Sequence, residues 1–427
     1  MKKILPMTNG LRGELKIPGD KSISHRSVIL SSLGTTPVEI TNFLAGADCL
    51  STIACMRALG AKIEQFGEKI LVTGRGLHGL SEPEDILDAG NSGTTLRLLM
   101  GLLSAQKFLS TFTGDNSLRK RPMARVIKPL IEMGASIFGR KNNQNLPITI
   151  IPTKKLRGIV YEMPIASAQV KSAILLAGLF AEGATTVIEP AFSRDHTEKM
   201  LSAFGARLER TGKAIKIYPA EEFFAPKSIF VPGDISSAAY WLVLATILRD
   251  SDVILRNVGV NETRTGILDV LKRMGARIEL LNERISGGER AADVRIVSSK
   301  LRGVEIGGEI IPRLIDEIPA LAVAAAFAEG TTIIRDAGEL RVKESDRLAA
   351  IVDEFSKIAP NSFSATENSL IIRGGGEKIF ANCKTRADHR MAMSLAIFGA
   401  AAKGLTLDDA DCVKISYPNF FDALKVD

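Results

Sequence analysis

The chain has 427 residues, of which 45% are hydrophobic, 24% charged and 5% aromatic, and its formal net charge is +7 with a pI near 9.1. A chain of this length is too long for a single core, so two or three domains are expected, and so apolar a composition excludes a disordered protein. The basic residues are dispersed and aromatic residues are scarce, which disfavours nucleic-acid binding and favours a positive cleft that acts on small anions.

The N-terminus and the longest apolar runs predict a cytoplasmic protein that does not enter a membrane. The first apolar run is broken by Pro6 and followed by Arg12 and Glu14, which is not the pattern of a signal peptide. Residues 318–328 form one of the longest apolar runs. Such runs are well short of the roughly 20 residues that a membrane-spanning helix needs.

Cysteine usage gives no sign of a metal centre or a disulfide framework. The four cysteines have neither metal-ligand spacing nor a CxxC pair, and they stand at Cys49, Cys55, Cys383 and Cys412. Only four histidines are available to complete a metal site. We therefore expect no structural zinc and no disulfides.

One turn sequence occurs twice. "PGDKSISHR" begins at Pro18 and "PGDISSAAY" begins at Pro232, about half a chain later. In each copy the glycine permits a sharp turn and the aspartate can cap the helix that follows. The repetition indicates that the chain consists of two similar halves.

Two patterns repeat about every 70 residues along the chain. An apolar-Gly-Ala tripeptide, which ends an amphipathic helix and precedes an alternating strand, begins at residues 59, 133, 204 and 274. An Ala/Leu-rich helix, followed by glycine and a strand, begins near residues 22, 91, 167, 234, 316 and 388. Chance recurrence of Ala-rich helices is the alternative, but the regular interval favours six repeated units.

Units of this size predict the fold. Each holds two helices and three or four short strands, so we expect an α/β (α+β) protein in which the apolar helices of three units pack around a common centre and the strands face outward. The predicted domains are residues 20–232, and residues 233–427 completed by residues 1–19.

Charged groups stand at helix starts where a buried core does not need them. Lys21, Ser22 and Arg26 lie on the first turns of an otherwise apolar helix, and Gly93 opens another helix with Arg97 one turn on. Free N–H groups, a partial positive charge and a glycine that admits a ligand together favour an anion site. A Gly-Thr-Thr helix start alone is explained equally well as an ordinary cap, so the inference depends on the combination.

Other polar groups in the first half have competing explanations. The basic residues 119–121 are typical of a solvated turn. Ser167 is explained as a helix cap, whereas capping does not explain Gln169.

The second half shows the same ambiguity. Asp316 could be the N-cap of a buried helix, and the charges at residues 343–347 are typical of a salt-bridged surface helix. Residues 388–390 place three ionisable groups before an apolar helix, which is unusual unless they line a site.

Seven of these segments occur together in one known family. They follow each other along essentially the whole chain as "PGDKSISHR", "GNSGTTLR", "RKRPM", "SAQVKSA", "IDEIP", "RVKESDR" and "DHRMA". By these motifs the chain resembles the 5-enolpyruvylshikimate-3-phosphate synthase family of enolpyruvyl transferases. The resemblance implies the enolpyruvyl transferase fold: two globular domains of three βαβαββ units each, an inside-out α/β barrel, with the active site in the interdomain cleft.

The resemblance also implies an activity. Family members transfer the enolpyruvyl group of phosphoenolpyruvate to the 5-hydroxyl of shikimate 3-phosphate and release phosphate, by addition and elimination through a tetrahedral intermediate, on the route to chorismate and the aromatic amino acids. The implied enzyme is a cytoplasmic monomer without metal or cofactor. It is a glyphosate target, and Gly93, where some relatives carry a methyl group, predicts sensitivity.

The nearest alternative is the sister enolpyruvyl transferase that acts on UDP-N-acetylglucosamine. That family usually carries a reactive cysteine in the loop that matches residues 114–122, where this chain has none. "KSISHR" in place of that family's Lys-Asn pair also favours the shikimate substrate.

The resemblance assigns site residues by position. Those implied for phosphoenolpyruvate are Lys21, Gly93, Arg121, Gln169, Arg347 and Arg390. Those implied for shikimate 3-phosphate are Lys21, Ser22, Arg26, Ser167, Ala168, Gln169, Ser193, Asp316 and Lys343.

Three residues are implied to move protons. Asp316 is expected to take the proton of the 5-hydroxyl, Glu344 to act as acid and base at the methylene carbon, and Lys21 to assist the hydroxyl and the departing phosphate. The chain departs from some relatives at Ile415, where they carry a lysine, so Lys414 is not assigned to the site.

Overall fold

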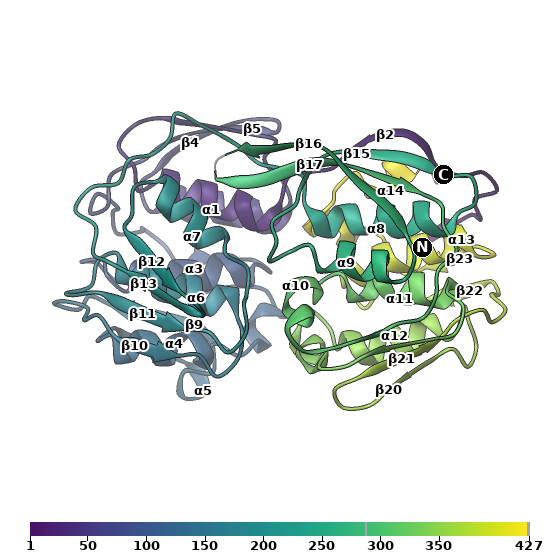
Figure 1. Cartoon of the computed structure of the whole chain (residues 1–427). Coiled ribbons are helices and arrows are strands. Elements are labelled where there is room, and N and C mark those ends of the chain that lie inside the picture. The colour runs from purple at the N-terminus through teal and green to yellow at the C-terminus, as the bar shows by residue number, and fades with distance from the viewer. Residues whose placement is uncertain (287, 425–427) are drawn as a thin grey trace. The chain divides into compact units, whose positions relative to one another are not determined.

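The computed structural model describes residues 1–286 and 288–424, so residues 287 and 425–427 of the predicted second domain lie outside the described residues. The chain forms two compact units, whose ribbons are drawn in Figure 1. The N-half unit contains Gly19–Val231 and Ser286–Glu289. The C-half unit contains Met1–Pro18, Pro232–Ile285 and Arg290–Asp427.

The N-half unit contains three sheets of the same design. Its strands are β3 (Val38–Thr41), β4 (Lys62–Phe66), β5 (Lys69–Thr73), β6 (Leu87–Asp88), β7 (Ser110–Thr113), β8 (Ser136–Gly139), β9 (Asn145–Ile151), β10 (Val160–Glu162), β11 (Thr185–Ile188), β12 (Leu208–Thr211), β13 (Ala214–Ile217) and β14 (Ser228–Phe230). The strand orders are β14-β3-β5-β4, β6-β7-β9-β8 and β10-β11-β13-β12. In each sheet the first pair is parallel and the other two pairs are antiparallel.

The C-half unit repeats this design with help from the N-terminus. Its strands are β1 (Lys2–Ile4), β2 (Arg12–Lys16), β15 (Asp252–Gly259), β16 (Arg277–Ser286), β17 (Glu289–Val297), β18 (Glu305–Ile306), β19 (Thr331–Ile334), β20 (Phe363–Ala365), β21 (Leu370–Arg373), β22 (Ala381–Cys383) and β23 (Leu405–Leu407). The strand orders are β16-β17-β15-β2, β18-β19-β21-β20 and β1-β23-β22. Because β2 pairs with β15 and β1 pairs with β23, the first residues of the chain complete this unit.

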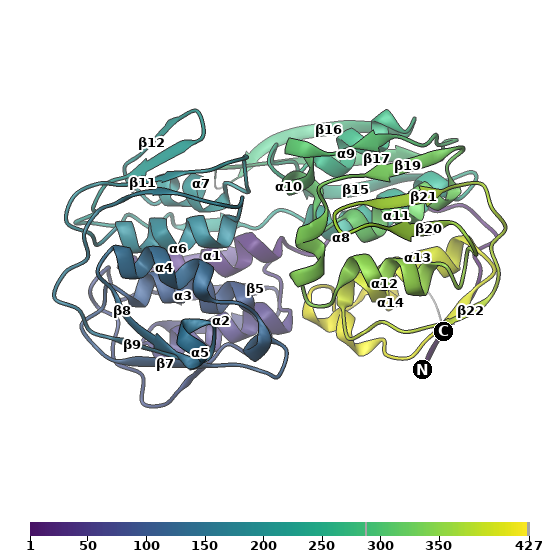
Figure 2. The ribbon, with the colours of Figure 1, turned by 90° about the horizontal axis from the view of Figure 1, so that it is seen from below.

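Six apolar helices form the two cores. They are α1 (Lys21–Ser31), α3 (Gly93–Leu103) and α6 (Ala168–Gly178) in the N-half unit, and α8 (Ile235–Ile247), α11 (Ile318–Phe327) and α13 (His389–Ala401) in the C-half unit. Nearly all their residues are buried, as expected of helices that are apolar on all sides. Within each unit these helices run side by side and the sheets lie around them (Figures 1 and 2).

A second set of helices alternates with the core helices. It comprises α2 (Ala47–Ala58), α4 (Ala124–Glu132), α7 (His196–Ala203), α9 (Gly266–Arg273) and α12 (Arg347–Phe355). Shorter helices are α5 (Arg140–Asn143), α10 (Ile311–Leu314) and α14 (Phe420–Leu424), with 3₁₀ turns η1 (Leu118–Lys120), η2 (Gly308–Ile310), η3 (Gly338–Val342) and η4 (Asp411–Ile415). The order β6, α3, β7, α4, β8, β9 is one βαβαββ unit, so the predicted fold class is confirmed.

The glycine of each apolar-Gly-Ala tripeptide ends a helix of this second set, as predicted. Gly60, Gly134, Gly205 and Gly275 have φ values of +91°, +99°, +87° and +104°. A left-handed residue at this position closes the helix and turns the chain into the next strand, and glycine adopts it without a steric penalty.

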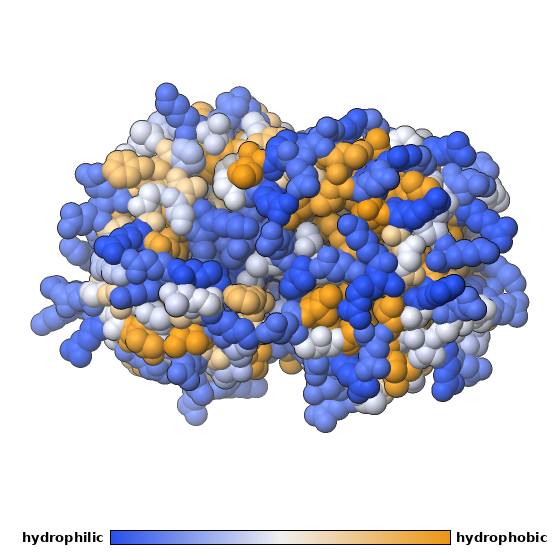
Figure 3. Space-filling view, viewed as in Figure 1, coloured by the Kyte–Doolittle hydropathy of each residue, from blue (hydrophilic) through white to orange (hydrophobic). Residues whose placement is uncertain are grey.

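The face drawn in Figure 3 is mainly hydrophilic. Polar side chains cover most of the face in Figure 3, and apolar residues are interspersed among them, as is normal for protein surfaces. None of the helices in the described part of the chain has the length and apolarity needed to cross a membrane.

Candidate active site

The first helix start holds a lysine against a carboxylate. Asp20 caps α1, since its Oδ1 accepts the N–H of Ile23 at 2.9 Å, and this confirms the role predicted for the aspartate of the first turn. Lys21 follows, and its Nζ lies 3.0 Å from Oδ2 of Asp48 at the start of α2. The ammonium therefore has a defined position on the first turn of α1.

Arg26 is a buried cation held by neutral groups. Its Nε donates to Thr197 Oγ1 at 2.6 Å, its Nη2 to Ser172 Oγ at 2.8 Å and its Nη1 to the carbonyl of Ser22 at 3.0 Å. The residue is 4% exposed, and burial lowers the pKa of its guanidinium to about 10. These three partners carry no charge, although the carboxylates of Glu198, Asp20 and Glu289 lie close enough to offset part of the desolvation, and Arg26 remains a cation that can attract an anion.

Gln169 connects the starts of α6 and α3. Its Oε1 accepts from Arg97 Nη1 at 2.6 Å, and its Nε2 donates to Thr94 Oγ1 at 2.9 Å. Gly93 lies beside this network, because a Cβ built there would lie 2.6 Å from Arg97 Nη1 and 3.4 Å from Arg121 Nη1. The glycine thus leaves space for guanidinium groups next to a helix N-terminus.

The remaining predicted groups of the N-half unit stand on loops and caps. Arg121 follows η1, and its Nη2 donates to Asn91 Oδ1 at 2.7 Å. Ser167 caps α6 with a long contact of 3.5 Å from the N–H of Val170, and Ala168 opens that helix. Ser193 is buried, and its N–H donates to Glu189 Oε1 at 3.1 Å.

Arg347 is the centre of the charged cluster in the C-half unit. Its guanidinium lies 2.5 Å from Glu344 Oε2, 2.8 Å from Asp388 Oδ2 and 3.4 Å from Asp316 Oδ1. Burial opposes its charge, but the neighbouring carboxylates, led by Asp388, raise the pKa of Arg347 above its usual value. The arginine therefore stays charged and brings the predicted acid–base residues Asp316 and Glu344 together.

Arg390 and Lys343 extend this cluster. Arg390 Nη2 lies 3.7 Å from Asp316 Oδ2, and its Nη1 donates to the Asp316 carbonyl at 3.2 Å. Lys343 is half-buried, and desolvation lowers the pKa of its ammonium although Asp316 opposes this shift. Together with Arg347, three cations thus surround the Asp316 carboxylate near the start of α11.

The structure settles two alternatives that the sequence left open. Glu317, and not Asp316, occupies the N-cap position of α11, and its side chain makes no capping bond. Glu317 instead lies 3.7 Å from Arg264. The surface-helix interpretation of residues 343–347 is wrong for Arg347, which is 1% exposed.

Several residues that orient this candidate site were missed by sequence reasoning. Thr197 and Ser172 hold Arg26, and Asp48 pairs with Lys21. Arg194 was also missed, although its charge lies close enough to Arg26 to help lower the pKa of that residue. The polar run "SRDHTEK" at the start of α7 was the available indication, because a purely structural helix start does not need so many polar side chains.

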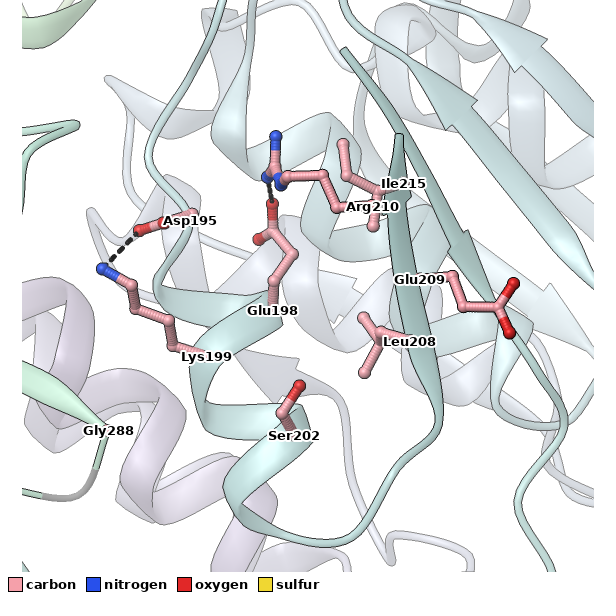
Figure 4. Close-up of a pocket in the computed structure, with 9 residues that line it drawn as sticks. All are labelled: Asp195, Glu198, Lys199, Ser202, Leu208, Glu209, Arg210, Ile215 and Gly288. Carbon is pink, nitrogen blue, oxygen red and sulfur yellow. Dashed lines mark hydrogen bonds and ion pairs between the residues drawn. The ribbon is translucent and has the colours of Figure 1, made fainter. Parts of the chain in front are cut away.

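A charged hollow lies elsewhere on the N-half unit (Figure 4). It has a volume of about 330 Å³ and is lined by Asp195, Glu198, Lys199, Ser202, Leu208, Glu209, Arg210, Ile215 and Gly288. None of the predicted site residues lines it. Within the described residues we find no group of three His, Cys, Asp or Glu side chains that could hold a metal ion, and the expectation that no metal or cofactor is needed stays a prediction.

Comparison with solved structures shows the class of protein to which this fold belongs. The fold matches that of the enolpyruvyl transferase NikO from Streptomyces tendae, with a TM-score of 0.80, 19% identity, and coverage of 99% of this chain and 96% of that one. It also matches EPSP synthase from Acinetobacter baumannii, with a TM-score of 0.89, 43% identity, and coverage of 99% and 97%. The fold is that of an enolpyruvyl transferase.

Sequence comparison then gives the family. The family model described as EPSP synthase (3-phosphoshikimate 1-carboxyvinyltransferase) matches residues 6–424. The 3-phosphoshikimate 1-carboxyvinyltransferase of Desulforamulus reducens is 52% identical over 100% of this chain and 99% of its own length. That of Desulforudis audaxviator is 54% identical over 99% and 98%. The chain belongs to the EPSP synthase family, and it is a transferase of the shikimate pathway.

Proposed function

We propose that the basic helix starts and the Arg347 cluster bind the two anionic substrates of 3-phosphoshikimate 1-carboxyvinyl transfer. The residues proposed for shikimate 3-phosphate are Lys21, Ser22, Arg26, Ser167, Ala168, Gln169, Ser193, Asp316 and Lys343. Those proposed for phosphoenolpyruvate are Lys21, Gly93, Arg121, Gln169, Arg347 and Arg390. Each substrate carries a phosphate and a carboxylate, so several cations are needed to offset their mutual repulsion.

One observation supports the catalytic assignment above the others. Asp316 and Glu344 both contact the guanidinium of Arg347, at 3.4 Å and 2.5 Å. An arginine that binds phosphoenolpyruvate would therefore hold the substrate beside two carboxylates that can exchange protons with it. A surface ion pair would not need this convergence on a buried cation.

The proposed reaction proceeds in two stages. In the first, Glu344 gives a proton to the methylene carbon, Asp316 takes the proton of the 5-hydroxyl, and the hydroxyl oxygen bonds to the cationic carbon to form the tetrahedral adduct. In the second, Glu344 removes a proton from the new methyl group as the carbon–phosphate oxygen bond breaks. Lys21 assists the hydroxyl and the departing phosphate, which carries away the proton taken by Asp316, and the carbon–carbon double bond is restored in the product as an enol ether.

The proposal requires that both units present groups to the same two substrates, because Arg26 belongs to the N-half unit and Asp316 to the C-half unit. Domain closure on the substrates would exclude water from the reaction. Action as a cytoplasmic monomer is part of this proposal. Light scattering on the purified protein and cell fractionation test that part.

Two matched substitutions test the assignment of Arg26 to shikimate 3-phosphate and of Arg347 to phosphoenolpyruvate. Arg26→Gln should weaken shikimate 3-phosphate binding, measured by calorimetry, by at least about tenfold, because a charge-assisted contact is lost. Arg347→Gln should instead raise the KM for phosphoenolpyruvate. Arg57→Gln is the control, since Arg57 is an exposed residue of α2 that binds the carbonyl of Ile63. Equal effects of the two site variants on both substrates would contradict the assignment.

A further inference from the structure

Lys171, at the end of the first turn of α6, is a charge with no exposed surface. Its Nζ lies 2.9 Å from Glu189 Oε2, 2.8 Å from Glu198 Oε1 and 3.3 Å from the carbonyl of Ser193. The side chain is 0% exposed. Each of the three ammonium protons thus has an acceptor, so this lysine is suited to holding protein groups in place.

Glu189, which follows β11, completes the contacts around Ser193. Its Oε1 accepts the Ser193 N–H at 3.1 Å and also the Ser193 hydroxyl, while its Oε2 binds Lys171. The N–H, the hydroxyl and the carbonyl of Ser193 are therefore all bound by the Lys171–Glu189 pair. No conformational freedom is left to this residue without breaking a buried polar contact.

The same ammonium also holds the far end of the segment that begins at Ser193. Glu198, on the first turn of α7, binds Lys171. It also reaches Arg210 of β12 at 2.9 Å, and this second contact is drawn in Figure 4. Lys171 is thus fixed to both ends of residues 193–198. Between those ends lie Arg194, whose charge acts on Arg26, and Thr197, which accepts from Arg26 Nε at 2.6 Å.

A buried ion pair is not an efficient way to stabilise a fold. Desolvation of two charges offsets much of their attraction, and well-packed apolar residues of similar size often stabilise as well or better. What apolar residues cannot do is bind the N–H, hydroxyl and carbonyl of one loop residue at once.

We propose that the Lys171–Glu189 pair is a positioning device that fixes residues 193–198, and through them Arg26, for binding the phosphorylated ring substrate. Neither residue needs to touch the substrate. The inference rests on the proposed function, since it takes Arg26 to bind shikimate 3-phosphate. It goes further because it assigns a role in substrate binding to two buried residues that need not touch the substrate.

The test is binding of shikimate 3-phosphate to the purified full chain by calorimetry, with Glu189→Gln as the first variant. Glutamine keeps the shape and an acceptor for Ser193 but removes the charge that holds Lys171. The dissociation constant should rise about tenfold, as expected for the loss of a charge-assisted contact. The KM for phosphoenolpyruvate at saturating shikimate 3-phosphate should change less than about twofold. A variant whose fold is generally disturbed would instead lose affinity for both substrates.

Two further variants distinguish a specific loss of substrate affinity from a general loss of folding. K171M/E189Q removes both charges of the pair and leaves Glu198 with Arg210, so it should fold and show the same selective loss. Asp293→Asn is the matched control in the C-half unit, because Asp293 is 5% exposed, pairs with Arg256 at 2.6 Å and accepts the N–H of Asn257 at 2.7 Å. The control should lower the melting temperature without changing the affinity for shikimate 3-phosphate.

A double-mutant cycle shows whether Glu189 acts through Ser193. If it does, S193A/E189Q should bind no more weakly than the weaker of its two single variants. The inference would be overturned if folded Glu189→Gln and K171M/E189Q bound shikimate 3-phosphate as tightly as the unmodified chain. It would also be overturned if Asp293→Asn lost as much affinity as they do. In either case a selective loss in Arg26→Gln would still uphold the proposed function. Absence of shikimate 3-phosphate binding by the unmodified chain would instead overturn the proposed function and this inference with it.

Discussion

Asp388 and Arg347 form a buried two-point ion pair in the C-half unit. Asp388 Oδ2 accepts from Arg347 Nε at 2.8 Å, and its Oδ1 accepts from Nη2 at 3.2 Å. The same Oδ1 accepts the N–H of Arg390 at 2.9 Å and so caps α13. One carboxylate therefore orients the guanidinium of Arg347 and fixes the helix start that carries Arg390.

Asp388→Asn should separate this orienting role from the capping role. Asparagine caps a helix about as well as aspartate, but it removes the most deeply buried of the three carboxylates around Arg347. We expect the KM for phosphoenolpyruvate to rise by about tenfold or more, because the guanidinium loses a charge-assisted partner. The affinity for shikimate 3-phosphate should be unchanged by calorimetry. An equal loss for both substrates would indicate a general collapse of the unit.

Asp316→Ala should abolish turnover while shikimate 3-phosphate binding stays within about tenfold, because a base is needed for the reaction more than for ground-state binding. Phosphate release and calorimetry on the same preparation measure the two quantities. Asp316 also lies 3.4 Å from Arg347, so Asp269→Ala, which removes a carboxylate 2.8 Å from Arg313 in the same unit, is the control for loss of an ion pair. Loss of binding with Asp316→Ala would make the residue structural.

Gly93→Ala should weaken inhibition by glyphosate. The added methyl group would lie 2.6 Å from Arg97 Nη1, so this flexible side chain must shift and its bond to Gln169 is disturbed. The unmodified chain is expected to be inhibited by glyphosate in competition with phosphoenolpyruvate. The variant should need several-fold more glyphosate for half inhibition, and its KM for phosphoenolpyruvate should rise by a smaller factor. Turnover that persists in millimolar glyphosate at low phosphoenolpyruvate would refute the prediction for the unmodified chain.

Lys343 should set an alkaline limit to shikimate 3-phosphate binding. Desolvation lowers its pKa from the usual 10.5, and the ammonium form is the one that attracts the substrate phosphate. As the pH rises through this lowered pKa the charge is lost, so kcat/KM for shikimate 3-phosphate should fall at a lower pH than an ordinary lysine would allow. A pH profile of Lys343→Arg should show the fall displaced to higher pH. An unchanged profile would exclude Lys343 as the titrating group.

Sequence periodicity was sufficient to predict the repeated helices and strands, because the capping residues and turn glycines that begin and end these elements lie within each repeat. The glycines at 60, 134, 205 and 275 end helices with positive φ, and Asp20 and Asp234 cap helices, as their positions predict. Helices that are apolar on all sides, such as α8 and α11, could only be core helices. What periodicity could not give is the pairing of β1 and β2 with strands from the second half, since strand pairing between distant segments leaves no local pattern.

The candidate site was predictable only in part. Lys21, Arg26 and Gln169 were conspicuous because charge or amide groups stand at the start of apolar helices. Arg347 was not, because its sequence neighbours are those of a surface helix and its burial depends on Asp388, 41 residues away. The Lys171–Glu189 pair was also missed, since a lysine within an apolar helix gives no indication of which distant carboxylate neutralises it.

The measurement that tests the account most directly is phosphate release by the purified chain with phosphoenolpyruvate and either shikimate 3-phosphate or UDP-N-acetylglucosamine as the second substrate. The account predicts release with shikimate 3-phosphate alone, suppressed by glyphosate and abolished by Asp316→Ala. Release with UDP-N-acetylglucosamine, or with neither compound, would contradict it, and the basic helix starts of the N-half unit would then need a different anionic ligand.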